Sequence, residues 1–92
     1  MPAPTAITLY TQPFCQPCKR IKFVLQREGV PFEEVDVSQD HQALEAIKEL
    51  GYARVPVMVV RPARSDTDLH WSGLKPDLIR EHCINPSKEV AA

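Results

Sequence analysis

Two cysteines separated by two residues, Cys15 and Cys18, are the side chains of this sequence best suited to chemistry. They follow a short apolar stretch and stand where a helical pattern begins. Both thiols therefore lie about one turn apart at a helix N-terminus. The unpaired N–H groups and the dipole of such a terminus stabilise a thiolate, which is the form that attacks disulfides. The spacing predicts a dithiol that transfers electron pairs by opening and closing a disulfide.

The same spacing also occurs in metal sites, which is the main alternative from another functional class. A structural zinc site needs about four ligands, usually from a second pair of Cys or His residues. The remaining candidates are His41, His70, His82 and Cys83, and only the last two are neighbours. Adjacent residues on a helix point about 100° apart and rarely bind one ion. We therefore predict no metal ligands, although a zinc or iron–sulfur module remains the rival to a redox role.

The two thiols are predicted to have different roles. Cys15 stands at the start of the helix, with Lys19 one turn further on, and is the expected nucleophile. Cys18 lies inside the helix on the same face and is expected to resolve the mixed disulfide that Cys15 forms with a target. Gln16 and Pro17 between them are expected to modulate the acidity of Cys15.

Composition limits the kind of protein this is. Ninety-two residues, 43% hydrophobic and 25% charged, predict one globular domain over 1–85 with a short tail over 86–92. A net charge of −1 gives no reason to expect binding to nucleic acid or to an anionic membrane. No apolar run approaches the roughly 18 residues of a membrane span. The start of the chain lacks the pattern of a signal peptide, and three cysteines are not a dispersed disulfide framework, so we expect a cytoplasmic protein.

The apolar pattern predicts the element order β-α-β-α-β-β-α. Strands are expected over 6–10, 32–37, 55–61 and 69–72, and helices from 15 or 16 to 28, from a cap at Ser38 to 50, and over 76–83. The first two strands are joined by a helix and should be parallel, whereas the last two form a hairpin through the loop 62–69. One polar face places the second strand nearer a sheet edge. The result is an α/β fold, a four-stranded mixed sheet with helices on both faces.

Pro56 stands at the head of the predicted third strand, where a proline is unusual because it has no N–H for the ladder. One interpretation is a trans proline at the first residue of a strand, and the other is a cis Val55–Pro56 bond. At this place in this topology we predict cis. That geometry turns the backbone of Val55 toward the cysteines, where its N–H and C=O can pair with an extended substrate segment.

The segment 70–77 combines a turn with a helix start. Trp71 is either a core anchor or part of a binding corner, and Ser72 can hydrogen-bond across the turn. Asp77 in the first turn suits the helix dipole. Cys83, in contrast, is expected to be a small buried apolar residue of the last helix.

Together, three segments resemble the glutaredoxin-like proteins and, more narrowly, the NrdH-type redoxins. Tyr10-Thr11-Gln12-Pro13-Phe14-Cys15-Gln16-Pro17-Cys18 is similar to their active-site segment, Arg54-Val55-Pro56 to their cis-proline motif, and Trp71-Ser72-Gly73-Leu74-Lys75-Pro76-Asp77 to the W-S-G-F-R-P-[DE] segment typical of the NrdH group. The resemblance covers residues 6–83 and implies a thioredoxin/glutaredoxin fold. It also implies a partner-binding surface made of Gln12, Phe14, Gln16, Pro17, Val55, Pro56, Trp71, Ser72, Gly73 and Lys75.

The resemblance implies thioredoxin-like partners. Electrons would come from NADPH through a flavin-containing thioredoxin reductase and pass to the disulfide of a class Ib ribonucleotide reductase, with no cofactor bound to this chain, which is expected to be a monomer. Ordinary glutaredoxins bind glutathione partly through a lysine before the cysteines and a late G-G-x-D turn. Here Gln12 and Gly73-Leu74-Lys75 stand at those places. A glutathione-dependent dithiol glutaredoxin is the alternative.

Overall fold

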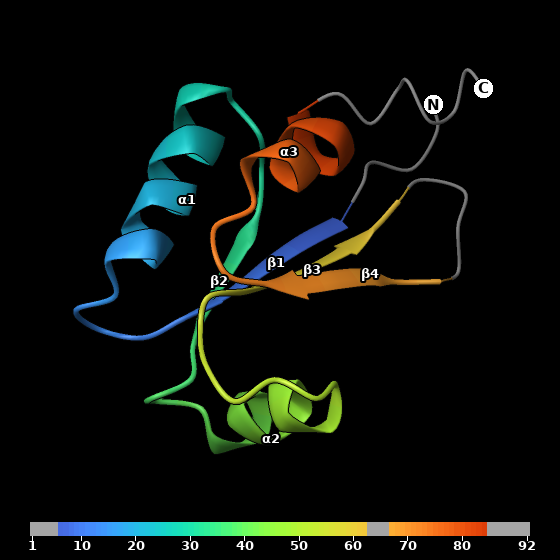
Figure 1. Ribbon diagram of the computed structural model, residues 1–92. Coiled ribbons are helices and arrows are strands. Elements are labelled where there is room, and N and C mark those ends of the chain that lie inside the picture. The colour runs from blue at the N-terminus through green and yellow to red at the C-terminus, as the bar shows by residue number, and fades with distance from the viewer. Residues whose placement is uncertain (1–5, 63–66, 85–92) are drawn as a thin grey trace.

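A computed structural model of the protein describes residues 6–62 and 67–84, and Figure 1 shows their arrangement. The strands are β1 (Ala6–Thr11), β2 (Glu33–Asp36), β3 (Val57–Arg61) and β4 (Leu69–Ser72), and the helices are α1 (Gln16–Arg27), α2 (His41–Glu49) and α3 (Pro76–Ile79). The predicted element order is confirmed. The expected tail over 86–92, the chain start and the middle of the expected loop 62–69 lie outside the described residues.

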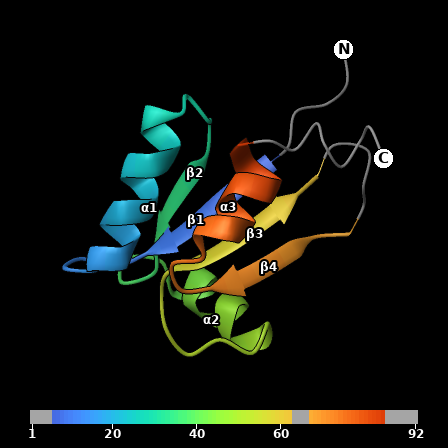
Figure 2. The same cartoon turned by 45° about the horizontal axis from the view of Figure 1, so that its top comes forward.

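The four strands form one mixed sheet in the order β2-β1-β3-β4 (Figure 2). β1 runs parallel to β2, as the helical crossover predicts, and β3 is antiparallel to both β1 and β4. The prediction of an edge position for β2 is confirmed. Tyr10 pairs with Val57, and Val57 pairs with Ser72. The end of β1, the start of β3 and the end of β4 therefore meet at the same end of the sheet.

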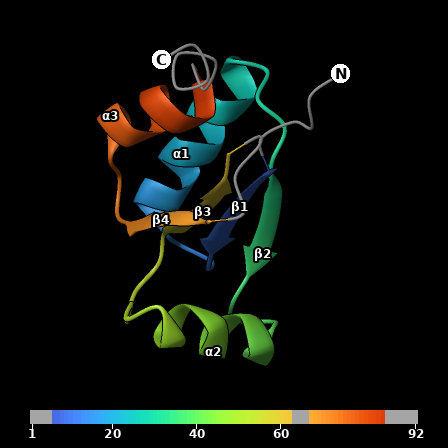
Figure 3. The same ribbon diagram turned by 90° about the vertical axis from the view of Figure 1, so that its right-hand side faces the viewer.

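Helices cover both faces of the sheet. α1 and α3 lie on one face and α2 lies on the other, as Figures 1 and 3 show. Since side chains alternate along a strand, each strand contributes to both layers. The core beneath α1 and α3 contains Ile7, Leu9, Ile21, Leu25, Met58, Val60, Trp71, Ile79 and Cys83. The smaller core beneath α2 contains Val37, Ala43, Ile47 and Val57.

α1 is positioned by a narrow apolar stripe. Ile21 and Leu25, four residues apart, are fully buried against the sheet. The helix holds four basic residues, Lys19, Arg20, Lys22 and Arg27, and no acidic one. Burying each aliphatic side chain contributes about 2 kcal/mol, so this stripe fixes how the first turn of α1 meets the end of β1.

The start of α2 differs from the prediction. Asp40, and not Ser38, is the N-cap, because its Oδ1 accepts the Ala43 N–H at 3.0 Å. Ser38 instead lies in the turn before the helix, where its N–H and Oγ both donate to Asp36 Oδ1, at 2.9 and 2.6 Å. Leu50, the expected last residue of this helix, is the C-cap and is 40% exposed. The helix is therefore shorter at both ends than its pattern indicated.

The other differences lie at element boundaries. Thr11 belongs to β1 rather than to the loop after it, and β3 begins at Val57, so Val55 and Pro56 precede the strand. The last helix changes pitch: α3 continues as a π-helical segment, Arg80–Ile84. Segments of this kind are uncommon and often occur at functional sites. No helix among the described residues is long and apolar enough to cross a membrane.

The corrected cap of α2 can be tested by two alanine substitutions. Asp40→Ala removes the acceptor of the Ala43 N–H, so the free energy of unfolding should fall by about 1 kcal/mol. Ser38→Ala is the matched control and should change it by less than about 0.5 kcal/mol, because the serine is exposed and outside the helix. Urea unfolding of the oxidised protein gives both values. A larger loss for Ser38→Ala than for Asp40→Ala would show that the cap is wrongly assigned.

Candidate redox site

Cys15 and Cys18 form a disulfide at the start of α1, with their Cα atoms 5.2 Å apart. Cys15 is the N-cap residue and has an extended backbone, whereas Cys18 lies within the first turn. Both are largely buried, yet unequally: Cys15 is 8% exposed and Cys18 is 1% exposed. Cys15 is therefore the more exposed of the two disulfide-bonded residues.

The sulfur of Cys15 caps the helix. The backbone N–H of Cys18 points at Cys15 Sγ, with an N–S distance of 3.2 Å. The first turn contains no carboxylate that could compete for this position. Pro17 stands in the same turn, where the N–H that proline lacks would have been unpaired in any case. Once the disulfide is reduced, the amide and the positive end of the helix dipole stabilise a thiolate on Cys15.

Phe14 bends the chain into the helix. Its φ of +64° lies in the left-handed region, which is rare for an aromatic residue and energetically costly. Its side chain is 94% exposed, although an apolar ring in water is unfavourable. Phe14, directly before Cys15, is therefore unfavourable both in its backbone conformation and in its exposure. Gln12, Gln16 and Pro17 around it are also exposed.

The predicted cis bond between Val55 and Pro56 is confirmed. This dipeptide leads into β3 at the end of the sheet where β1 leads toward Cys15. The Gly73 N–H donates to the Pro56 carbonyl oxygen at 2.9 Å, so the corner after β4 is tied to the same place. Gly73 has a φ of +83°, which favours glycine at this corner. Three segments distant in sequence thus meet at one end of the sheet.

The residues at the end of β4 and in the corner after it are not equally accessible. Trp71 is 7% exposed and packs in the core, its ring centroid 5.9 Å from that of His82. Of the two interpretations of Trp71, a core anchor therefore fits the position of its side chain. Ser72 and Gly73 are half-buried, whereas Lys75 is exposed at the N-terminus of α3. Asp77 lies in the first turn of α3, as expected.

A polar link beneath the site was not predicted from the sequence. Thr11, the last residue of β1, is buried, and its hydroxyl donates to a Glu34 carboxylate oxygen at 3.1 Å. The same oxygen accepts from Lys22 Nζ at 2.9 Å. This link joins β1, β2 and α1 just before the chain turns toward the cysteines. The only signal in the sequence is a polar residue that continues the alternation of Ile7 and Leu9.

The third cysteine is separate from this chemistry. Cys83 lies in the core beneath α3, and burial raises the pKa of its thiol to about 12. A thiol with so high a pKa is a poor nucleophile at neutral pH. No group of three or more His, Cys, Asp or Glu side chains suited to a metal ion occurs among residues 6–62 and 67–84.

Comparisons with known proteins agree on the kind of molecule. The glutaredoxin family model matches residues 7–62. The glutaredoxin-like protein NrdH of Escherichia coli K12 is 31% identical over 86 residues, 94% of this chain and 96% of that protein. The gene 56 protein of Mycobacterium phage L5 is 37% identical over 76 residues, 82% of this chain and 69% of its own length. The solved NrdH-redoxin of Escherichia coli superimposes with a TM-score of 0.70 and 33% identity, covering 82% of this chain and 91% of that one.

The burial of Cys83 predicts its reactivity. Because burial raises its pKa to about 12, the Cys83 thiol is almost entirely protonated at pH 8. Iodoacetamide should therefore modify Cys15 of the reduced native protein at least about a hundredfold faster than Cys83. Mass spectrometry of peptides after timed alkylation measures both rates. In concentrated guanidinium chloride all three cysteines should react alike, and comparable native rates for Cys83 and Cys15 would contradict its burial.

Proposed function

The chain belongs to the glutaredoxin family, as an NrdH-type redoxin, and on that basis we propose that it is a dithiol electron donor to protein disulfides. The observation that carries the proposal is the Cys15–Cys18 disulfide, in which the sulfur of Cys15 caps α1. This geometry favours a thiolate at Cys15 and keeps Cys18 shielded next to it. The two thiols thus have the unequal positions that an attacking and a resolving cysteine require.

In the proposed cycle, the Cys15 thiolate attacks one sulfur of a target disulfide. A new S–S bond forms between Cys15 and the target, and the other target sulfur leaves as a thiolate. Cys18 then loses its proton to solvent and attacks Cys15 Sγ, which releases the second target sulfur. The target gains two electrons and two protons and becomes a dithiol, while the protein is left with the Cys15–Cys18 disulfide.

We propose that the target segment lies between the loop before Cys15 and the corner after β4. Phe14 offers an exposed ring, and Gln12, Gln16 and Pro17 offer exposed surface next to the sulfur. The backbone of Val55, ahead of Pro56, is the proposed partner for an extended segment. Ser72, Gly73 and Lys75 complete the other side, and Trp71 supports them from the core.

The proposed source of electrons is NADPH, through a flavoprotein thioredoxin reductase, and no cofactor bound to this chain is required. The solved NrdH-redoxin of Escherichia coli has a thioredoxin-like activity profile. It resembles this chain over 82% of this chain's length. The proposed target is the disulfide of a class Ib ribonucleotide reductase, in the cytoplasm. Gln12, where glutathione-binding relatives carry a lysine, supports this choice over glutathione.

A coupled assay separates the two reductants. With NADPH and a bacterial thioredoxin reductase, the protein should support steady reduction of insulin disulfides, followed as NADPH consumption at 340 nm. With glutathione, glutathione reductase and NADPH in its place, turnover should be at least about tenfold slower, because Gln12 stands where glutathione-binding relatives carry a lysine. A dithiol glutaredoxin from another source is the positive control for the second system. Efficient turnover in the glutathione system and not in the thioredoxin reductase system would contradict the proposed reductant.

The roles of the two thiols are tested by single serine substitutions. Cys18→Ser should accumulate a mixed disulfide between Cys15 and the target, because the resolving thiol is missing. Cys15→Ser should form no such adduct and should lose turnover. Non-reducing gels and intact-mass spectrometry detect the adduct, and Cys83→Ser is the matched control that should retain full activity. Full dithiol turnover by Cys18→Ser would show that the assignment of the resolving cysteine is wrong.

A further inference from the structure

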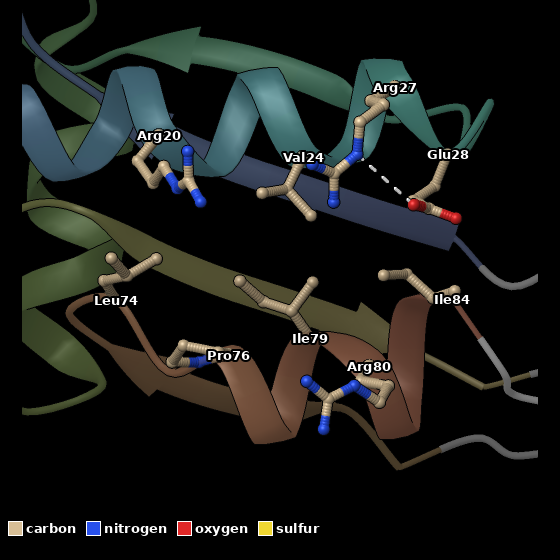
Figure 4. A pocket seen from close by; sticks show the side chains of 9 residues that line it. All are labelled: Arg20, Val24, Arg27, Glu28, Leu74, Pro76, Ile79, Arg80 and Ile84. Atoms are coloured by element: carbon tan, nitrogen blue, oxygen red, sulfur yellow. Dashed lines mark hydrogen bonds and ion pairs between the residues drawn. The ribbon is translucent and has the colours of Figure 1, made fainter.

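A groove of about 340 Å³ runs between α1 and α3, outside the disulfide site. Figure 4 shows its two walls, with α1 on one side and α3 and its π-helical continuation on the other. Its lining residues are Arg20, Val24, Arg27, Glu28, Leu74, Pro76, Ile79, Arg80 and Ile84. We call it the arginine groove.

The arginine groove is basic in a protein that is weakly acidic overall. Three arginines and one glutamate line it, whereas the whole chain carries a net charge of −1. Arg20 has no carboxylate within ion-pair distance among residues 6–62 and 67–84, so its charge is uncompensated there. Within the same part of the chain, Arg27 and Arg80 form exposed ion pairs, with Glu28 at 3.4 Å and with Asp77 at 3.7 Å. Such pairs are weak and exchange readily for a better-placed carboxylate.

Two of the arginines are held in place by an aromatic ring. The guanidinium carbons of Arg20 and Arg27 lie 5.7 and 5.6 Å from the centroid of the Phe23 ring. Phe23 is itself half exposed on α1. Cation–π contacts of this kind restrict the long side chains before any partner arrives. Less conformational entropy is then lost when a carboxylate binds.

The floor of the arginine groove is apolar. Val24 from α1 faces Ile79 from α3, and Leu74 and Ile84 lie toward opposite ends (Figure 4). Leu74 is one of the few large hydrophobic side chains that remain exposed. The groove therefore combines an apolar floor with cationic rims, a surface that complements a segment carrying both apolar and acidic side chains.

One end of the arginine groove lies at Leu74, in the corner after β4. Leu74 follows Gly73, whose N–H is bonded to the carbonyl of Pro56, and Arg20 lies within two turns of Cys15. From Arg20 to Glu28 the helix rises about 12 Å, the length of about four extended residues. A chain whose disulfide reaches Cys15 can thus lay its flanking residues into the groove.

We propose that the arginine groove binds an acidic, apolar segment that flanks the disulfide of the target protein. The inference rests on the proposed function as an electron donor. It adds that the protein prefers targets whose disulfide is flanked by acidic and apolar residues. Apolar side chains of the segment contact the floor, and its carboxylates pair with Arg20 and Arg80 at the rims. The groove selects the target and takes no part in the exchange of sulfur bonds.

Three synthetic disulfide peptides test the proposal. In each, an intramolecular disulfide is followed by four residues in which leucine alternates with glutamate, glutamine or lysine. Reduction by the fully reduced wild-type protein should be about tenfold more efficient, in kcat/KM, for the glutamate peptide than for the glutamine peptide, and lowest for the lysine peptide. This preference should shrink between 20 mM and 500 mM salt, because the ion pairs are exposed.

The double variant Arg20→Gln/Arg80→Gln should lose the preference for glutamate over glutamine. Lys48→Gln, which removes a cation from exposed α2 and not from the groove, is the control and should keep it. Equal reduction of all three peptides by the wild-type protein, or an unchanged preference in the double variant, would contradict the proposed role of the arginine groove. Neither result would contradict the electron-donor function. If none of the peptides is reduced, the proposed function fails as well. Sedimentation that shows a wild-type dimer and a monomeric double variant would assign the groove to a second copy, against the proposal.

Discussion

The structure depends on one contact: the sulfur of Cys15 accepts the backbone N–H of Cys18 and so begins α1. A helix usually starts with a serine, threonine, aspartate or asparagine, whose oxygen is a better acceptor than a sulfur atom. Here the cap and the reactive atom are the same. The sulfur therefore cannot leave the helix dipole without uncapping α1, and the electrostatic environment of the site is fixed by the secondary structure itself.

That arrangement requires a rigid approach to the helix. The alternating burial of Ile7, Leu9 and Thr11 holds β1 in the sheet until four residues before Cys15. The chain then turns at Phe14. The turn requires a left-handed backbone at this residue, which is energetically costly for any residue other than glycine. The buried stripe of Ile21 and Leu25 holds α1 against the sheet. Packing thus offsets the cost at Phe14, and the site is shaped by residues that do not touch it.

Most of this could be predicted from the sequence because it rests on local patterns. Apolar alternation predicts the strands. A Cys-x-x-Cys at a helix start predicts that the two sulfur atoms lie one turn apart at the helix N-terminus. What failed depended on competition between neighbours. Ser38 and Asp40 are both good caps, and Asp36 decides the outcome by accepting the serine's N–H and hydroxyl. The π-helical segment and the Thr11–Glu34 link depend on packing between elements distant in the chain, which no local pattern contains.

The remaining question is why such a site would discriminate among targets at all. Any accessible disulfide can meet a thiolate, so the chemistry of Cys15 and Cys18 cannot by itself be selective. Their burial changes this, since a target must present its sulfur as part of a segment that fits the surrounding surface. That surface is asymmetric: α1 carries only positive charges, whereas β2 carries only negative ones. The cysteines begin α1, so the basic side chains of that helix follow them directly in the chain. The selection by charge that we propose for the arginine groove therefore depends on which helix holds the dithiol.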